Sequence, residues 1–257
     1  MTRYSLPHDL AGEQQRLKLM SALLDPLERA HINRLGLGPG WRCLELGAGN
    51  GSIARILAEL VAPSGHVVAS DIDVRIMADL HIRCLEVRRL DVMQDPIEEE
   101  SYDFVVARAL LHHLPGRRNA LRRMVEALKP GGVILSIEPD MLPCTVAEPA
   151  SMRAFWQAWL KWSGQSGIDY FVGRRIPAWL DALGIERVAG EGDTVHFSGG
   201  SDWAMYWTST IRELAPPLVD SGDMTQKMLE DFYSLYENPH YWTSVITFTA
   251  TSGRKPA

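Results

Sequence analysis

The sequence lacks a long hydrophobic run, an excess of basic residues and any paired-cysteine motif. Its apolar runs fall well short of the roughly 20 residues that cross a bilayer, and the N-terminal stretch has no signal-peptide hydrophobic segment. Lys and Arg number 26 against 32 Asp and Glu, a net charge of -6, so nucleic acid would meet no basic face. Cys43, Cys84 and Cys144 form no CxxC pair. These absences predict a reduced, cytoplasmic protein that binds neither membrane nor nucleic acid.

What the sequence does contain is an alternation of short Val/Ile/Leu-rich runs with helical patterns over residues 36–140. This alternation predicts βαβ units and a parallel sheet. The expected strands are 42–46, 67–70, 85–90, 102–107 and 133–137, and the expected helices between them are 52–61, 74–80 and 119–128.

The flanking segments have a different character. Leu17, Met20, Leu24 and Leu27 recur at helical spacing before the first strand, and seven of the eight Trp lie beyond residue 140. There we expect helices at 154–163, 176–183 and around 203–214, a strand within 188–197 and a last strand at 245–249. The chain is therefore predicted to be one α/β domain with a Rossmann-like, doubly wound, mainly parallel seven-stranded sheet. Its expected parts are a helical leader (1–35), a core (36–140), a mostly helical cap with strand six inserted after strand five (141–243), and a last strand and tail (244–257).

A glycine-rich turn, Leu44–Gly51 (LELGAGNG), stands between the first expected strand and the next helix. Glycines at such a junction let the backbone turn sharply and approach a ligand closely. Asp71 ends the second expected strand, 20 residues after Gly51, where a carboxylate can accept hydrogen bonds from ribose hydroxyls. The two features indicate a nucleoside-containing cofactor. A dinucleotide fingerprint would need glycine at residue 52, where this sequence has Ser52.

The ordered motifs of residues 40–140 resemble those of the class I methyltransferases that use S-adenosylmethionine (SAM). The first motif of that family is acidic-x-Gly-x-Gly-x-Gly, which matches Glu45 to Gly51. The later matches are Leu90-Asp91-Val92, Ser101–Val106, Leu111–Pro115 and Leu128–Gly132. Within the class, the chain looks most like the bacterial small-molecule group that includes the quinone-biosynthesis methyltransferases. The resemblance implies SAM as the cofactor and S-adenosylhomocysteine as its product.

The resemblance also implies where the cofactor binds. Asp71 would bind the ribose, Asp91 would meet the adenine amino group with Val92 against the ring, and Arg108 could meet the cofactor carboxylate. The leader would fold over the cofactor and bring Tyr4 near. The full expected set is Tyr4, Glu45, Gly47, Ala48, Gly49, Gly51, Asp71, Ile72, Asp91, Val92 and Arg108.

Two adjacent histidines, His112 and His113, are the predicted catalytic bases. They follow the fourth expected strand, and histidine can accept a proton near neutral pH. Because neighbours on a helix point about 100° apart, only one is expected to face the cleft. His113 matches the family's recurrent histidine. Its spacing from Arg108 resembles the phosphoethanolamine methyltransferase branch, although Ala109 stands where that branch has Asp.

The substrate pocket is expected between the end of strand five and the cap. Aromatic residues at helical spacing are typical of a packed core, but a cap over the cleft must also line the pocket. The expected pocket residues are Glu138, Asp140, Trp156, Trp203 and Tyr206. They indicate a small, apolar or aromatic substrate. We expect no metal, because no three-ligand oxygen set is evident.

The predicted function is methyl transfer from SAM to an O, N or C atom of such a molecule, in keeping with bacterial secondary metabolism. Two alternatives stay open. One is a protein that binds SAM without transferring methyl, for example a cyclase. The other is an NAD(P)-dependent oxidoreductase, against which Ser52 and the lack of a Tyr-x-x-x-Lys pair argue. A homodimer also stays open, since exposed cap aromatics could form an interface.

Overall fold

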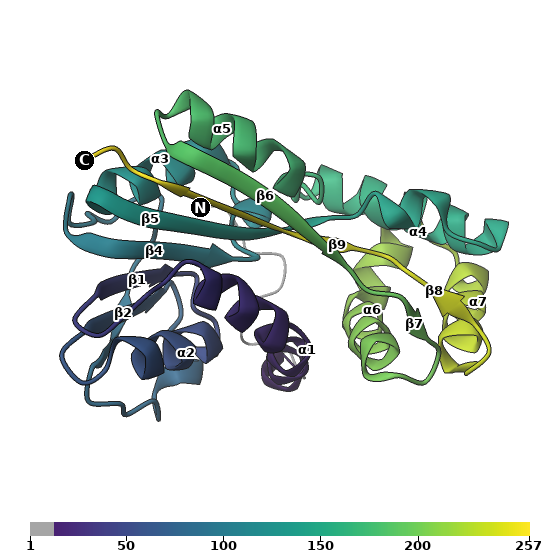
Figure 1. Ribbon diagram of the computed structural model, residues 1–257. Coiled ribbons are helices and arrows are strands. Elements are labelled where there is room, and N and C mark those ends of the chain that lie inside the picture. Colours follow the sequence, from purple (N-terminus) through teal and green to yellow (C-terminus); the bar gives the residue numbers. More distant parts are fainter. Residues whose placement is uncertain (1–12) are drawn as a thin grey trace.

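The computed structural model describes residues 13–257 and contains a seven-stranded sheet with helices on both faces (Figure 1). The strand order is β3-β2-β1-β4-β5-β9-β6. The pairs from β3 to β5 are parallel, whereas β9 runs antiparallel to both β5 and β6. The strands are β1 (Arg42–Leu46), β2 (His66–Asp71), β3 (Leu85–Arg89), β4 (Tyr102–Arg108), β5 (Leu128–Asp140), β6 (Glu186–Thr194) and β9 (Thr247–Arg254). The predicted Rossmann-like, mainly parallel sheet is confirmed.

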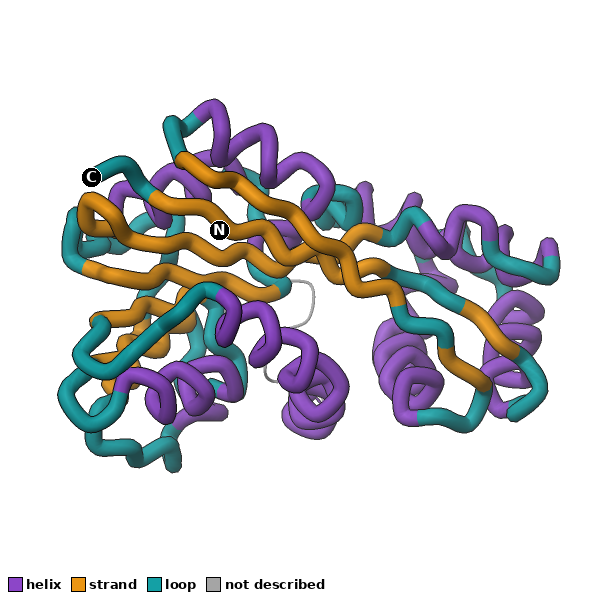
Figure 2. The backbone as a smooth tube through the Cα atoms, in the orientation of Figure 1, coloured by secondary structure: helices purple, strands orange, loops and turns teal. Residues whose placement is uncertain are grey.

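Helices cover the sheet and extend beyond it (Figure 2). The α-helices are α1 (Glu13–Arg34), α2 (Ser52–Val61), α3 (Arg117–Ala127), α4 (Ala150–Gln165), α5 (Ile176–Ala182), α6 (Asp202–Asp220) and α7 (Gln226–Glu237). Short 3₁₀ turns are η1 (Arg75–Met77), η2 (Leu111–His113), η3 (Pro143–Val146) and η4 (Gly173–Arg175), and β7 (Phe197–Ser198) pairs with β8 (Trp242–Thr243). No helix of residues 13–257 is long and apolar enough to cross a membrane.

The central strands are buried on both faces, which is why they read as nearly continuous apolar runs. Along β1, Cys43 belongs to the cluster that also contains α2, whereas its neighbour Leu44 belongs to the cluster with α3 and α5. This alternation follows from the pleat, which points successive side chains to opposite faces. Burial on both faces fixes the register of the strands and so aligns their carboxyl ends at one edge.

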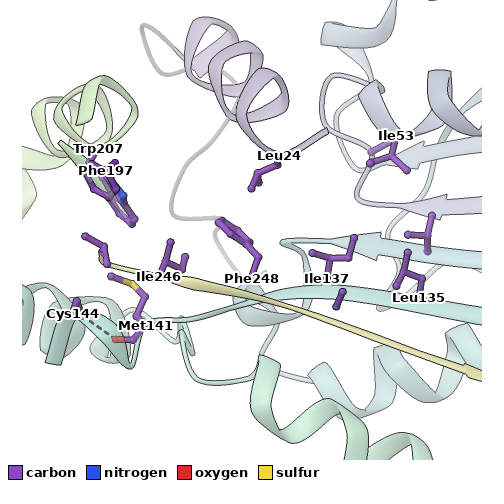
Figure 3. Close-up of a cluster of buried hydrophobic side chains, with 14 of the residues drawn as sticks. Leu24, Ile53, Leu135, Ile137, Met141, Cys144, Phe197, Trp207, Ile246 and Phe248 are labelled. Carbon is purple, nitrogen blue, oxygen red and sulfur yellow. Dashed lines mark hydrogen bonds between the residues drawn. The ribbon is translucent and has the colours of Figure 1, made fainter. Parts of the chain in front are cut away.

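The helices α4, α6 and α7 gather beyond that edge and share an aromatic core (Figure 1). Phe155 of α4 stacks on Phe232 of α7 at 4.4 Å, and Trp156 meets Trp207 of α6 edge-on at 5.0 Å between ring centroids. Figure 3 shows that the cluster continues from Trp207 through Ile246 and Phe248 toward the sheet. The helical cap and the sheet therefore share one hydrophobic core.

Two expectations about elements need correction. The helix expected over 74–80 is only the 3₁₀ turn η1, because Met77 and Leu80 pack beneath Gly51 and leave no continuous apolar face to bury. The last strand continues to Arg254 rather than ending in a polar tail, because β9 pairs with a strand on each side. The residue bounds that the sequence predicted for the leader, the core, the cap and the tail remain predictions.

Candidate active site

A cavity of about 570 Å³ lies at the carboxyl ends of β1, β2, β3 and β4, between α1 and α6. That size is typical of small-molecule sites, and its place matches where open α/β sheets bind ligands. One end, which we call the loop end, is lined by residues 46–50, 71–73, 75 and 89–95. The other, the cap end, is lined by Met20, Pro139, Tyr170, Tyr206, Trp207, Thr210, Ile246 and Phe248. His112 and His113 also line the cavity.

The glycine turn requires glycine for two different reasons. Gly47, Gly49 and Gly51 all have φ between +56° and +73°, a region that other residues rarely adopt. In addition, a Cβ at Gly47 would lie 2.9 Å from Leu110, and one at Gly51 would lie 2.7 Å from Leu80. Gly47, Ala48 and Gly49 line the cavity, whereas Gly51 is the N-cap of α2 and does not.

Asp71 connects the glycine turn to the end of β2. Its Oδ2 accepts a hydrogen bond from Gly49 N at 2.9 Å, and its Oδ1 accepts one from Asp73 N at 3.1 Å. A carboxylate can accept about four hydrogen bonds, so Asp71 keeps capacity for the hydroxyls of a ribose. Ile72 follows it in the cavity lining and is 50% exposed, an apolar surface beside the carboxylate.

Asp91 and Val92 follow β3 and also line the loop end. The Asp91 carboxylate accepts hydrogen bonds from Met93 N and from the Gln94 side chain, each at 2.8 Å. The structure thus brings Asp71, Ile72, Asp91 and Val92 to one end of the cavity. Their individual roles toward the cofactor stay predictions.

Arg108 lines the cavity, and its guanidinium is also engaged by α1. Its guanidinium is buried against α1, where it donates to Asp25 at 2.9 Å and to Glu28 at 2.6 Å, and it also donates to Ser52. Two carboxylates therefore already neutralise the charge that was expected to meet the cofactor carboxylate. The sequence did not indicate this pairing, because α1 is far from Arg108 along the chain, and the role of Arg108 toward the cofactor stays a prediction.

Two other expected cofactor contacts differ from the structure or lie outside it. Glu45 is buried beneath the glycine turn and does not line the cavity. Burial raises its pKa to about 8, against the opposing effect of the Arg108 charge. The expected contact of Glu45 with the cofactor stays a prediction. Tyr4 lies outside the described residues.

His112 and Glu138 form a buried pair at the centre of the site. His112 Nδ1 lies 2.9 Å from Glu138 Oε2, and the Glu138 carboxylate also accepts the backbone N–H groups of Leu110, Leu111 and His112. Burial lowers the pKa of His112 to about 3 and raises that of Glu138 to about 7. A neutral ring that donates through Nδ1 leaves the lone pair on Nε2, the nitrogen that Glu138 does not bind.

His113 lies beside His112, with ring centroids 3.8 Å apart. Both histidines line the cavity, so the expectation that only one would face it is wrong. The short η2 turn lies against the cavity wall and carries both side chains there. Burial lowers the pKa of His113 well below its usual value. The carboxylate partner makes His112, rather than His113, the better candidate for a base.

The predicted substrate-pocket residues divide into two groups. Tyr206 lines the cap end, and Glu138 reaches the site through His112. Asp140 instead pairs with Arg174, and Trp156 is fully buried in the cap core. Trp203 packs between Phe197 and Phe248 and is outside the cavity lining. These three side chains thus lie outside the cavity lining. For the two tryptophans, helical spacing showed which residues share a face but not what that face contacts.

Sequence reasoning missed several lining residues. Tyr170 lies in the loop between α4 and η4, where Asp169 N donates to His112 O at 2.9 Å and places the Tyr170 ring 5.4 Å from the His112 ring. Phe248 comes from β9, the last strand in the chain. No local motif marks these positions. A pattern of isolated aromatics at the ends of predicted elements is the only signal that the sequence offered.

The fold and the cavity define a Rossmann-like protein that binds a nucleoside-containing ligand at the carboxyl edge of its sheet. Residues 44–134 match the family profile described as a methyltransferase domain. The ubiquinone/menaquinone biosynthesis C-methyltransferase UbiE of Ectopseudomonas mendocina is 30% identical over 145 residues, covering 53% of each chain. The highly reducing polyketide synthase ctvA of Aspergillus terreus is 35% identical over 111 residues, covering 39% of this chain and 5% of the synthase. The chain thus spans about half the length of the UbiE relatives and a small part of the synthase.

Solved structures agree on the fold. The YcgJ protein of Bacillus subtilis gives a TM-score of 0.60 at 15% identity, covering 89% of this chain and 98% of that one. A phosphoethanolamine N-methyltransferase of Haemonchus contortus, in complex with phosphomonomethylethanolamine and S-adenosylhomocysteine, gives 0.58 at 16% identity, covering 96% of this chain and 54% of that one. The profile match identifies a methyltransferase domain over residues 44–134, and the strand order and these structures show the fold of class I SAM-dependent methyltransferases.

The residues present fit the cofactor of this class, SAM. The backbone of Gly49 turns toward the cavity with a positive φ, where no Cβ blocks a ligand. Asp71 keeps hydrogen-bonding capacity for a ribose, and Ile72 presents an apolar surface of the kind that an adenine ring can pack against. Within residues 13–257 there is no group of three His, Cys, Asp or Glu that could hold a metal ion.

Proposed function

We propose that this protein transfers a methyl group from SAM to a small, largely apolar acceptor bound at the cap end, with His112 as the base. The observation that carries the proposal is the continuous cavity. It begins at the glycine turn and Asp71, runs past His112, and ends among Tyr170, Tyr206 and other aromatic side chains. A cofactor at one end and an acceptor at the other would meet beside the His112–Glu138 pair.

SAM, when bound, supplies a methyl group on a positively charged sulfonium. The protein's own residues hold the two reactants close and in line, which can account for much of the rate. His112 Nε2 accepts the proton that the acceptor loses. Glu138 holds the ring in one orientation through Nδ1 and, with its pKa raised to about 7, can share the proton.

The names of the relatives support an apolar acceptor. The UbiE relatives are named as C-methyltransferases of ubiquinone and menaquinone biosynthesis, and ctvA is named as a highly reducing polyketide synthase. The cap end of this protein, with its four aromatic rings and Ile246, suits a molecule of that polarity. The particular acceptor and its place in secondary metabolism remain part of the proposal.

Calorimetry and turnover test the proposed function together. We expect S-adenosylhomocysteine to bind with micromolar affinity, and NAD and NADP to give no heat. Once an acceptor that the wild-type protein methylates has been identified, His112→Ala should reduce kcat for it by about 100- to 10,000-fold, the usual contribution of a general base. The affinity for S-adenosylhomocysteine should stay unchanged. His240→Ala, at an exposed histidine outside the cavity, is the control.

Each unfavourable result has a distinct meaning. Binding of NAD in place of the adenosyl ligand would refute the cofactor assignment. Tight binding of S-adenosylhomocysteine without methyl transfer to any apolar acceptor would favour a protein that uses SAM without transferring methyl.

A further inference from the structure

A short loop between α4 and η4, residues 166–172, forms the wall of the cap end beside His112. Tyr170 is the residue of this loop that lines the cavity. Ile168 and Val172 are buried on either side of it, whereas Tyr170 itself is only partly buried. The position of the Tyr170 ring therefore depends on whatever holds the loop between these two buried side chains.

Asp169 attaches the loop to its neighbours. Its backbone N–H donates to His112 O in η2 at 2.9 Å. Its carboxylate accepts hydrogen bonds from Arg117 of α3 at 2.9 Å and from Arg175 of η4 at 2.5 and 2.6 Å. The same carboxylate accepts Phe171 N at 3.2 Å, inside the loop. A carboxylate accepts about four hydrogen bonds, so these partners use its whole capacity.

Arg117 is the stronger of the two charged anchors. The side chains of Arg117 and Asp169 are 19% and 18% exposed, whereas that of Arg175 is 44% exposed, where water screens the attraction. Arg117 also donates to Gly167 O at 2.9 Å, so it holds the loop at two points. Neither Arg117 nor Asp169 lines the cavity. This compensated ion pair therefore reaches an acceptor through the geometry of the loop.

The result of these contacts is a fixed place for the Tyr170 ring. Its centroid lies 5.4 Å from that of His112 and 6.0 Å from that of Trp159, which belongs to the aromatic core of the cap. Asp169 precedes Tyr170 in the chain and binds the backbone of His112, so it fixes the two rings relative to each other. The Tyr170 ring thereby limits the width of the cap end beside His112.

We infer that Asp169 is a positioning residue that sets the acceptor specificity of the cap end, because it holds the Tyr170 ring beside His112. This inference rests on the proposed function, which places the acceptor at the cap end. Asp169 does not touch the acceptor. Without its carboxylate the ring is no longer held, and the cap end admits wider aromatic molecules. The loop end of the cavity, where the cofactor is proposed to bind, is formed by other segments and stays unchanged.

Two variants break the ion pair from opposite sides. Asp169→Asn keeps the size of the side chain but sets an amide donor against the guanidinium donors. Arg117→Gln removes the other partner, and Tyr170→Ala removes the ring itself. Arg118→Gln is the matched control on α3, because Arg118 lies over a ring of α5 and not against the loop. Asp181→Asn, at an exposed position of α5, is the control for the change of charge.

Two measurements on the full chain loaded with S-adenosylhomocysteine compare these variants. One is the NMR chemical shift of the His112 Hε1 proton, which senses the nearby aromatic ring. The other is the affinity for 2-naphthol and for the wider 9-phenanthrol, measured by calorimetry. In Asp169→Asn, Arg117→Gln and Tyr170→Ala we expect the His112 resonance to move. We also expect the affinity for 9-phenanthrol relative to 2-naphthol to rise about tenfold.

The controls should match wild type in both measurements, and every variant should bind S-adenosylhomocysteine as wild type does. If Tyr170→Ala changes both readouts and Asp169→Asn changes neither, Asp169 does not position the ring. Equal effects of Arg117→Gln and Arg118→Gln would show that the ion pair is not the cause. Failure of both aromatic probes to bind the wild-type complex would also overturn the inference. Failure of S-adenosylhomocysteine itself to bind would instead refute the proposed function.

Discussion

At the scale of single residues, the chemistry of the site depends on one contact, that between His112 Nδ1 and the Glu138 carboxylate. Neither side chain is unusual by itself. Burial of both, together with three backbone N–H groups on Glu138, leaves a neutral imidazole next to a carboxyl with a pKa of about 7. The pair thus gains or loses one proton near neutral pH, and that proton belongs to the pair rather than to either residue.

Replacement of Glu138 by Gln tests this contact. Glu138 is charged only above its pKa of about 7, so the wild-type rate should fall as the pH decreases from 8 to 6. In Glu138→Gln, kcat should be about 100-fold lower than in wild type. The fall in rate between pH 8 and 6 should be absent from the pH profile of this variant. Glu148→Gln, at an exposed carboxylate, is the control. A pH profile of the variant that still bends near 7 would assign the ionisation to another group.

Asp71 offers a second test, this time of cofactor binding alone. Asp71→Asn should weaken binding of S-adenosylhomocysteine by about 1.5–3 kcal/mol, the scale of hydrogen bonds to a charged group. Part of that loss comes from the backbone of Gly49, which the carboxylate also holds. Calorimetry measures the change, with Asp79→Asn at an exposed position of the same loop as the control. Unchanged affinity would mean that the ribose lies elsewhere.

At the scale of elements, α1 buries Leu24 and Ile32 in the core and is also attached to it through polar groups. Ser21 and the backbone of Leu17 bind the Asn50 side chain of the glycine turn, while Asp25 and Glu28 bind Arg108. Farther along α1, His31 lies 2.6 Å from Asp193 of β6. The first turns of this helix carry the cavity-lining Arg16, Leu17 and Met20, so its attachment also sets one wall of the site.

Arg108→Gln should therefore destabilise α1. Removal of one partner from a buried ion pair typically costs about 3–5 kcal/mol, because the other charge stays buried. We expect a loss of that order in denaturant unfolding, with faster hydrogen exchange in residues 13–34. The double variant with Glu28→Gln should lose less than the sum of the two single changes. Arg29→Gln, which breaks an exposed ion pair with Glu59, should change stability little. A double variant whose loss of stability equals the sum of the two single losses would show that Arg108 and Glu28 do not stabilise each other.

At the scale of the whole molecule, buried carboxyl groups connect stability to pH. Burial raises the pKa of Glu28 and Glu138 to about 7 and that of Glu45 to about 8. In the unfolded chain these groups ionise near pH 4.5, so above that pH the folded state holds protons that the unfolded state has lost. Their contribution to stability is present below about pH 4.5 and is lost as the pH rises through 7 to 8.

Glu45→Gln isolates one such contribution. Between about pH 5 and 8, Glu45 should make wild-type stability fall by about 1.4 kcal/mol per pH unit. The isosteric amide cannot ionise, so the free energy of unfolding of the variant should rise relative to wild type by that amount per unit. Urea titrations at several pH values measure it, with exposed Glu59→Gln as the control. A constant difference between the two proteins would show that Glu45 is ionised in the folded state.

The comparison of sequence with structure separates local from long-range features. The strands from β1 to β5 were predictable because their apolar runs and the turns between them are local patterns. The glycine turn and Asp71 were predictable for the same reason, since spacing along the chain places both at the carboxyl edge. The helix expected at 74–80 was wrong because a helical pattern does not show how its apolar residues will pack, and Met77 and Leu80 pack beneath Gly51 from a short segment.

The sequence by itself determined the fold class and the loop end of the cavity, because residues close in the chain form both. Only the tertiary structure decided the rest of the site. The approach of α1 neutralised Arg108, the end of β5 brought Glu138 to His112, and three separate segments supplied Tyr170, Tyr206 and Phe248 to the cap end. Among these contacts, the hydrogen-bonded residues are 26 to 83 positions apart in the sequence. The energies that select them arise from burial and charge in the assembled core, which no local pattern encodes.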